Sequence, residues 1–256
     1  MMNQKLLSDF EHHLQNADRS PLTVRGYSAD AKQFVAWFEK SNKVDFSLAA
    51  VTPSDIREYR QVLQSERRRA STINRKLAAV AALMAWAQSS GQVASNPANG
   101  IKLVRQVPSA PKWLGKTQQY ALQRAIERDL QISQLRYPKR VVTRRRDASL
   151  TLFLLHTGLR LSEAVSLRLS DVEISERRGN VLVRNGKGGK QRIVPLNAEA
   201  RQALRDWLAV RPKSESDHLW VAVETDGAEG LTGRSVQRML QRYAQDAGMT
   251  DLTPHV

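Results

Sequence analysis

Apolar residues recur every three or four positions along the first ninety residues, which is the period of an amphipathic helix. One such stripe follows Pro21, a second follows Pro53 and a third covers residues 72–86. Each proline comes directly after Ser or Thr, a typical helix start, because the hydroxyl caps the helix and proline fits its first turn. A shorter amphipathic segment covers residues 5–14. The pattern therefore predicts a small helical bundle.

The helical pattern stops where prolines and glycine accumulate, at Pro97, Gly100, Pro108 and Pro111. Such residues interrupt regular structure, and few apolar positions repeat between them. We therefore predict a helical domain over residues 1–96, a linker over 97–111 and a second domain over 112–256.

The second domain mixes two periods. Stripes at helical spacing predict helices over residues 117–129, 148–156, 198–210 and 233–247, with another beginning near Arg160. Short runs at 172–174, 180–184 and 191–195 predict strands, and Asn185-Gly186 is a tight-turn signal between the last two. The expected fold class is mainly α with a small antiparallel sheet, that is, α+β.

Charge indicates the kind of partner. Lys and Arg number 40 against 25 Asp and Glu, which gives a net charge of +15, and both halves of the chain are basic. An excess of this size predicts a polyanionic partner, with nucleic acid first and an anionic membrane surface second. The longest apolar run, residues 150–155, is too short to span a bilayer, and no targeting segment opens the chain. We expect a cytoplasmic protein that binds no membrane.

Cofactor chemistry has little support in the composition. The absence of cysteine excludes disulfides, thiolate metal sites and a cysteine nucleophile. The five histidines have no metal-ligand spacing. We therefore expect neither a metal nor another cofactor.

Three segments carry candidate chemistry. Arg160 follows a glycine turn and opens a helix, where a guanidinium can bind two phosphate oxygens, and Glu163 one turn later can hold it in place. Lys187 lies in a glycine-rich basic hairpin tip that lacks the P-loop pattern. On the 233–247 helix, Arg and Gln side chains share one face and could read base edges. For each segment, a solvated charged surface is the alternative.

In this order, the segments resemble the tyrosine recombinase (phage integrase) family, and Xer-like recombinases in particular. The resemblance covers nearly the whole chain. Its most specific parts are residues 157–163 followed by Leu167, residues 186–196 (Gly-Lys-Gly-Gly-Lys-Gln-Arg-Ile-Val-Pro-Leu) and residues 252–256. It implies an N-terminal SAM-like core-binding domain and a catalytic domain that close around DNA as a C-shaped clamp.

The resemblance also implies a reaction. The family cuts and rejoins double-stranded DNA without metal or nucleotide, through a 3′-phosphotyrosyl intermediate. Arg160 matches the arginine that binds the phosphate, Lys187 the lysine that protonates the departing 5′ oxygen, His255 an acid/base or phosphate donor, and Glu163 a supporting acid. The residues that would contact DNA are Arg234, Gln237, Arg238, Gln241, Thr72, Asn74 and Arg75. Dimers to tetramers are expected on DNA.

One part of the family pattern is missing. A second arginine and the nucleophilic tyrosine should follow His255, yet all five tyrosines precede it and the sequence ends at Val256. We therefore expect a recombinase chain cut short before its tyrosine, which binds DNA but does not cleave it. The alternative function is that of a catalytically inactive fragment that competes for, or regulates, a specific DNA site.

Overall fold

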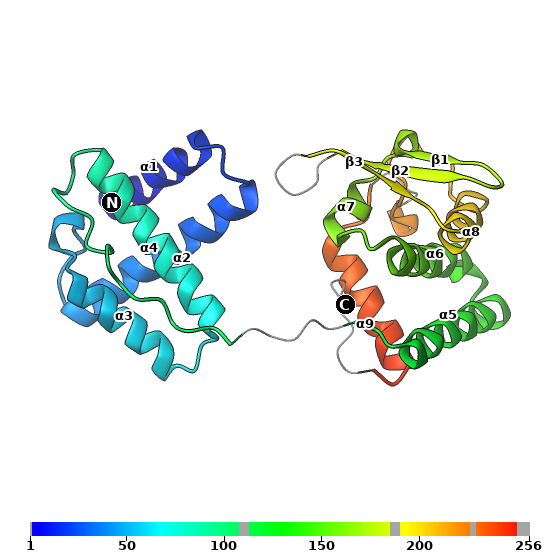
Figure 1. Cartoon of the computed structure of the whole chain (residues 1–256), viewed down its shortest axis with the longest axis horizontal. Coiled ribbons are helices and arrows are strands. Elements are labelled where there is room, and N and C mark those ends of the chain that lie inside the picture. The colour runs from blue at the N-terminus through cyan, green and yellow to red at the C-terminus, as the bar shows by residue number, and fades with distance from the viewer. Residues whose placement is uncertain (1, 108–112, 185–189, 226–228, 250–256) are drawn as a thin grey trace. The chain divides into compact units, whose positions relative to one another are not determined.

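A computed structural model describes residues 2–107, 113–184, 190–225 and 229–249. The chain divides into two compact units, Met1–Ser109 and Ala110–Val256, each with its own apolar core (Figure 1). No helix of the described ranges is long and apolar enough to cross a membrane.

The first unit consists of packed helices, as the pattern predicts. They are α1 (Met2–Asn16), α2 (Pro21–Asn42), α3 (Pro53–Ser65) and α4 (Ala70–Ser89). Ser20 caps α2 by accepting the Thr23 N–H, and Thr52 forms a reciprocal capping box with Asp55 at the start of α3. The predicted starts of both helices are confirmed.

The core of this unit is aromatic. The ring of Phe34 lies within 5.2–6.5 Å of the rings of Trp37, Phe38, Phe46 and Tyr59, measured between centroids. Phe34 has no exposed surface. The contact with Tyr59 joins α2 to α3, and the contact with Phe46 holds the connection between these two helices against α2.

The segment after α4 is docked rather than free. Ala98, Ile101 and Val104 pack against the core of the first unit. Arg60 also donates to the Lys102 carbonyl at 2.6 Å. The chain therefore leaves this unit later than the linker predicted over 97–111. These three apolar residues recur at steps of three, but Pro97 and Gly100 interrupt a helix there, so the sequence pattern did not indicate the docking.

The second unit is α+β. Its helices are α5 (Lys116–Arg136), α6 (Val141–Thr157), α7 (Leu161–Ser166), α8 (Ala198–Leu208) and α9 (Gly233–Asp246). Its strands are β1 (Val172–Ile174), β2 (Gly179–Val183) and β3 (Arg192–Pro195), paired antiparallel in the order β1-β2-β3 (Figure 1). The predicted fold class is confirmed. Helices α5 and α6 are longer than the predicted 117–129 and 148–156.

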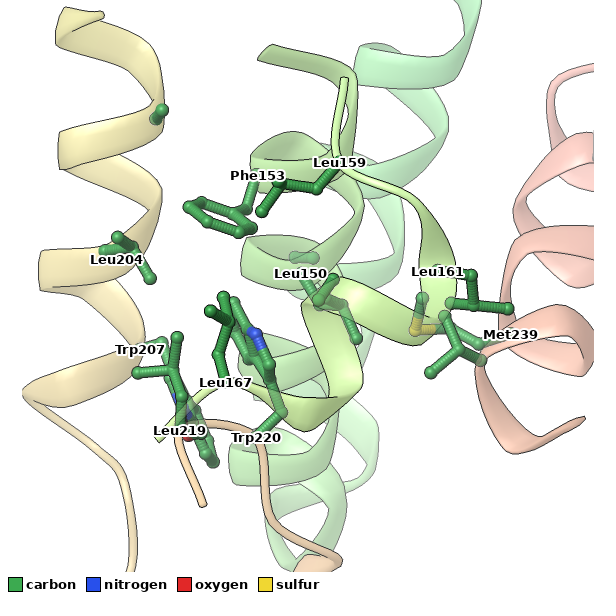
Figure 2. Close-up of a cluster of buried hydrophobic side chains, with 14 of the residues drawn as sticks. Leu150, Phe153, Leu159, Leu161, Leu167, Leu204, Trp207, Leu219, Trp220 and Met239 are labelled. Carbon is green, nitrogen blue, oxygen red and sulfur yellow. Dashed lines mark hydrogen bonds between the residues drawn. The ribbon is translucent and has the colours of Figure 1, made fainter. Parts of the chain in front are cut away.

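Two tryptophans centre the core of the second unit. The rings of Trp207 and Trp220 stack with centroids 6.0 Å apart, and the ring of Phe153 lies 5.7 Å from Trp220. The Trp207 indole donates to the Leu219 carbonyl at 2.7 Å. Figure 2 shows how Leu150, Phe153 and Leu204 converge on this pair from α6 and α8. The C-terminal end of α6, which leads into the candidate site, is thereby held against a rigid core.

Candidate active site

The turn between α6 and α7 places Arg160 at the surface. Gly158 ends α6 in the left-handed conformation, with φ 62°, and its N–H donates to the Leu154 carbonyl. Leu159 and Leu161, on either side of Arg160, are both buried in the core (Figure 2). With its neighbours anchored inward, the Arg160 side chain points outward and is 52% exposed.

Glu163 holds Arg160 through two contacts. Its Oε2 accepts the backbone N–H of Arg160 at 2.9 Å, and its Oε1 accepts from Nη1 of Arg160 at 2.9 Å. The carboxylate therefore caps the first turn of α7 and orients the guanidinium. The contact expected from the three-residue spacing is present.

A second arginine, which the sequence analysis missed, binds the same carboxylate. Nη1 of Arg192 donates to Oε1 of Glu163 at 2.9 Å, and Nη2 donates to Oε2 at 2.7 Å. Arg192 begins β3, opposite Val183 of β2. Glu163 and Arg192 are 29 residues apart, so no local spacing indicated the pair. The only hint was a third basic residue close after Lys187.

These contacts keep Glu163 charged. Hydrogen bonds from Arg192, together with those from the backbone and side chain of Arg160, lower the pKa of Glu163 to about 2, although burial alone would raise it. The site therefore contains a permanent negative charge between two guanidinium groups at any pH near neutrality.

Helix α9 presents the predicted polar face. Thr232 caps the helix by accepting the Ser235 N–H, while Val236, Met239, Leu240, Tyr243 and Ala244 are buried. Arg234, Gln237, Arg238 and Gln241 are exposed together on the other side. Arg242, which continues the arginine spacing, instead turns toward Asp129 and Asp147 at 3.4 and 3.3 Å. The exposed face therefore has a defined end.

The three residues predicted on α4 have different surroundings. Asn74 exchanges two hydrogen bonds of 2.9 Å with the backbone of Val104, which fixes the docked segment. Arg75 donates to buried Asp30 and stays about half-exposed. Thr72 is half-buried beside a cavity of about 350 Å³. Of the three, Arg75 offers a charge to a partner.

Comparison with known proteins places the chain in a family. The model of the phage integrase family matches residues 130–256, and that of the phage integrase N-terminal SAM-like domain matches residues 7–91. Tyrosine recombinase XerC of Chromobacterium violaceum is 30% identical over 239 residues, covering 93% of this chain and 73% of that protein. The chain belongs to the phage integrase family of tyrosine recombinases.

Other members are similar at the same level. Tyrosine recombinase XerC of Corynebacterium glutamicum is 29% identical over 251 residues, which cover 98% of this chain and 75% of the relative. The solved structure of XerH bound to a palindromic difH substrate shares the fold, with a TM-score of 0.73, 20% identity, and coverage of 97% of this chain and 70% of that one.

Two residues that the integrase resemblance assigns to the site, Lys187 and His255, lie outside the described residues. Within the described part of this integrase-family chain, no group of three or more His, Asp or Glu side chains could hold a metal ion. Among the described residues, the candidate site consists of Arg160, Glu163 and Arg192.

Proposed function

We propose that this protein is a site-specific DNA recombinase in which Arg160 binds the phosphate that is cut. One observation carries the proposal: an exposed guanidinium at the start of α7 is fixed through Nη1 alone. Its Nε and Nη2 make no hydrogen bond with any residue in the described ranges, so both are available to phosphate oxygens. Donors fixed in advance stabilise the extra negative charge of the transition state.

The family's reaction assigns the other steps. The tyrosine oxygen attacks phosphorus while its proton passes to His255, which acts as the base. The bond to the 5′ oxygen breaks, and Lys187 gives that oxygen its proton. The reverse attack by a 5′ hydroxyl rejoins the strand and releases the tyrosine. Neither direction requires a metal or nucleotide, since the phosphotyrosyl bond conserves the energy of the phosphodiester.

We further propose that residues 1–256 bind DNA without forming the covalent link. All five tyrosines precede His255 in the sequence. Tyr243 is buried, its hydroxyl donates to Asp129 at 3.0 Å, and burial raises its pKa above the usual range. Burial also raises the pKa of Tyr59 to about 12. These tyrosines are poor nucleophiles, and a polypeptide of this kind would act as a competitor for a DNA site.

A nicked suicide substrate tests the chemistry. Residues 1–256 should give no covalent protein–DNA adduct on a denaturing gel, because a positioned nucleophile is required. The same residues followed by a family segment with the second arginine and the tyrosine should give an adduct. That adduct should disappear with Arg160→Ala or with the added tyrosine changed to Phe. A robust adduct from residues 1–256 alone, or one that survives Arg160→Ala, contradicts the proposal.

Substitutions of two arginines should distinguish recognition of the DNA sequence from general affinity for DNA. Arg234→Ala, on the exposed face of α9, should reduce the discrimination between a selected and a scrambled duplex by about 1–3 kcal/mol, because it removes a donor to base edges. Arg75→Ala should weaken both duplexes by a similar factor if it meets phosphate. Competition binding to both duplexes measures each effect. An equal loss on both duplexes for Arg234→Ala would mean that α9 does not read the sequence.

The partners follow from the same proposal. Both units are basic, and we propose that both bind one duplex. A lambda integrase of the same fold, with a TM-score of 0.67, was solved as a tetramer bound to a Holliday junction. We propose dimers to tetramers of this chain on DNA, which sedimentation of the protein–DNA complex would measure.

A further inference from the structure

The carboxylate of Glu163 is shared evenly between two arginines. Oε1 accepts one hydrogen bond from Arg160 and one from Arg192, and Oε2 likewise accepts one from each residue. The side chain of Glu163 is only 2% exposed, so these four contacts take the place of water. Arg192 contributes the bidentate pair, whereas Arg160 contributes one side-chain and one backbone contact.

The charges of the cluster formed by Arg160, Glu163 and Arg192 decide how strongly Arg160 attracts a phosphate. Arg160 and Glu163 alone form a neutral pair, and a neutral pair attracts a phosphate weakly. With Arg192 the cluster carries one net positive charge. Arg160 and Arg192 are 52% and 40% exposed, so the surplus charge lies at the surface while the negative charge is buried. Low exposure of Glu163 also makes its field strong at both guanidinium groups.

The geometry without Arg192 would favour a different pairing. Arginine and carboxylate frequently form bidentate pairs, which use both oxygens. In the structure, Nη2 and Nη1 of Arg192 occupy positions on both oxygens of Glu163. The side chain of Arg160 therefore donates to this carboxylate through Nη1 alone.

We propose that Arg192 is a positioning residue that neutralises Glu163, so that Arg160 keeps its charge and orientation for a DNA phosphate. This inference rests on the proposed function of Arg160. The same contact attaches Arg192, the first residue of β3, to the first turn of α7. It thereby connects the sheet to the turn between α6 and α7 that carries Arg160. Arg192 therefore acts through Glu163 and Arg160 and need not touch the DNA.

A direct contact between Arg192 and phosphate is the competing explanation, since its side chain is partly exposed. The two roles respond differently to Glu163→Gln. If Arg192 only neutralises Glu163, removal of the negative charge makes Arg192 unnecessary, and the glutamine oxygen can still accept the backbone N–H of Arg160. If Arg192 binds phosphate itself, no change at Glu163 can replace the lost contact.

The test measures how strongly the affinity of the protein for a DNA duplex depends on the charge of a single phosphate. A duplex is first selected by the 256-residue chain from a random library. Each phosphate is then replaced in turn by an uncharged methylphosphonate, and the dissociation constant of the modified duplex is divided by that of the unmodified duplex. One position should give a ratio of about ten or more with the unchanged protein and a ratio near one with Arg160→Ala. A tenfold loss is the size expected for a charged hydrogen bond.

The variants should then form a pattern. Arg192→Ala should bring the ratio close to one, as Arg160→Ala does, and Arg192→Ala combined with Glu163→Gln should restore most of it. Arg192→Lys, which keeps the charge without the bidentate geometry, should be intermediate. Arg177→Ala removes an exposed arginine from the turn between β1 and β2 and is the matched control, with an unchanged ratio. Circular dichroism and thermal unfolding establish that each variant is folded.

The outcomes distinguish a failure of the proposed function of Arg160 from a failure of the positioning role of Arg192. If the unchanged protein shows no phosphate with an Arg160-dependent ratio, the proposed function of Arg160 fails. If that ratio is present but survives Arg192→Ala, the positioning role is overturned. If Arg192→Ala abolishes the ratio and Glu163→Gln does not restore it, Arg192 binds the DNA directly and the inference is also wrong. Should Arg192→Ala not fold, Arg192→Lys and the double variant decide in the same way.

Discussion

Raising the salt concentration from about 50 to about 200 mM should weaken binding of duplex DNA by roughly a thousandfold or more. The chain carries a net charge of +15, and exposed arginines such as Arg234 and Arg238 are present on α9. Each phosphate that a protein neutralises releases condensed counterions, so that affinity falls steeply with salt. Six to ten phosphate contacts, roughly what two basic units would supply, give about this loss.

Fluorescence anisotropy across a salt series measures the slope. Residues 1–107 and residues 108–256 should each show a shallower slope and a weaker affinity than the joined chain, because the connection makes the second contact intramolecular. Arg75→Ala should reduce the slope by about one unit if Arg75 meets phosphate. A flat profile for the whole chain would contradict the binding of DNA by both units.

The fold was predictable where local chemistry agrees with packing. Thr52 before Pro53 indicates the start of α3, and the run over residues 180–184 indicates β2, since each signal depends on a few neighbouring residues. The first turns of α6 were missed because Arg146 and Asp147 look like surface residues. Both are buried, and each satisfies the other's charge. A pairing of that kind is invisible to a hydrophobic pattern.

The site was predictable to the same extent. The pair of Arg160 and Glu163 follows from helical spacing, which fixes which side chains meet. The contact of Arg192 with Glu163 depends on how the sheet packs against α7, and that packing is not encoded in any short window. The same limit applies to the contact of Asn74 with the backbone of Val104, which joins residues 30 apart in the sequence; a DNA contact of Asn74 is implied by the family resemblance and stays a prediction.

Replacing Asp147 with alanine should lower the free energy of unfolding of the second unit by about 3 kcal/mol. Asp147 is buried and accepts from Nε and Nη2 of Arg146 at 3.0 and 2.7 Å, and from Arg242 at 3.3 Å. Burial raises the pKa of Asp147 even against the attraction of Arg146, so the pair itself adds little net stability. Loss of Asp147 is nonetheless costly, because Arg146 stays buried and keeps, among the described residues, only Glu224 and the Val221 carbonyl as hydrogen-bond partners.

Urea unfolding followed by tryptophan fluorescence measures this cost, since Trp207 and Trp220 are in the affected core. Asp246→Ala removes an exposed carboxylate from the end of α9 and should change stability by less than about 0.5 kcal/mol. Replacing Arg146 and Asp147 together by apolar residues of similar size should recover most of the loss, because Glu224, which then loses its partner, is 57% exposed and can be hydrated. A loss below about 1 kcal/mol for Asp147→Ala would mean that Glu224 alone satisfies Arg146.

Asp147→Ala should also weaken the recognition of the DNA sequence by α9. Arg242 connects α9 to Asp147 of α6 and to Asp129 of α5, at the opposite end of the helix from Arg234. Without Asp147, α9 loses the ionic contact of Arg242 with α6 and keeps the one with Asp129, while the polar face of the helix is unchanged. Asp147→Ala should therefore reduce the discrimination between selected and scrambled duplexes, even under conditions where the variant is folded. The discrimination should be unchanged in Asp246→Ala, and a folded Asp147→Ala protein with full discrimination would show that apolar packing alone positions α9.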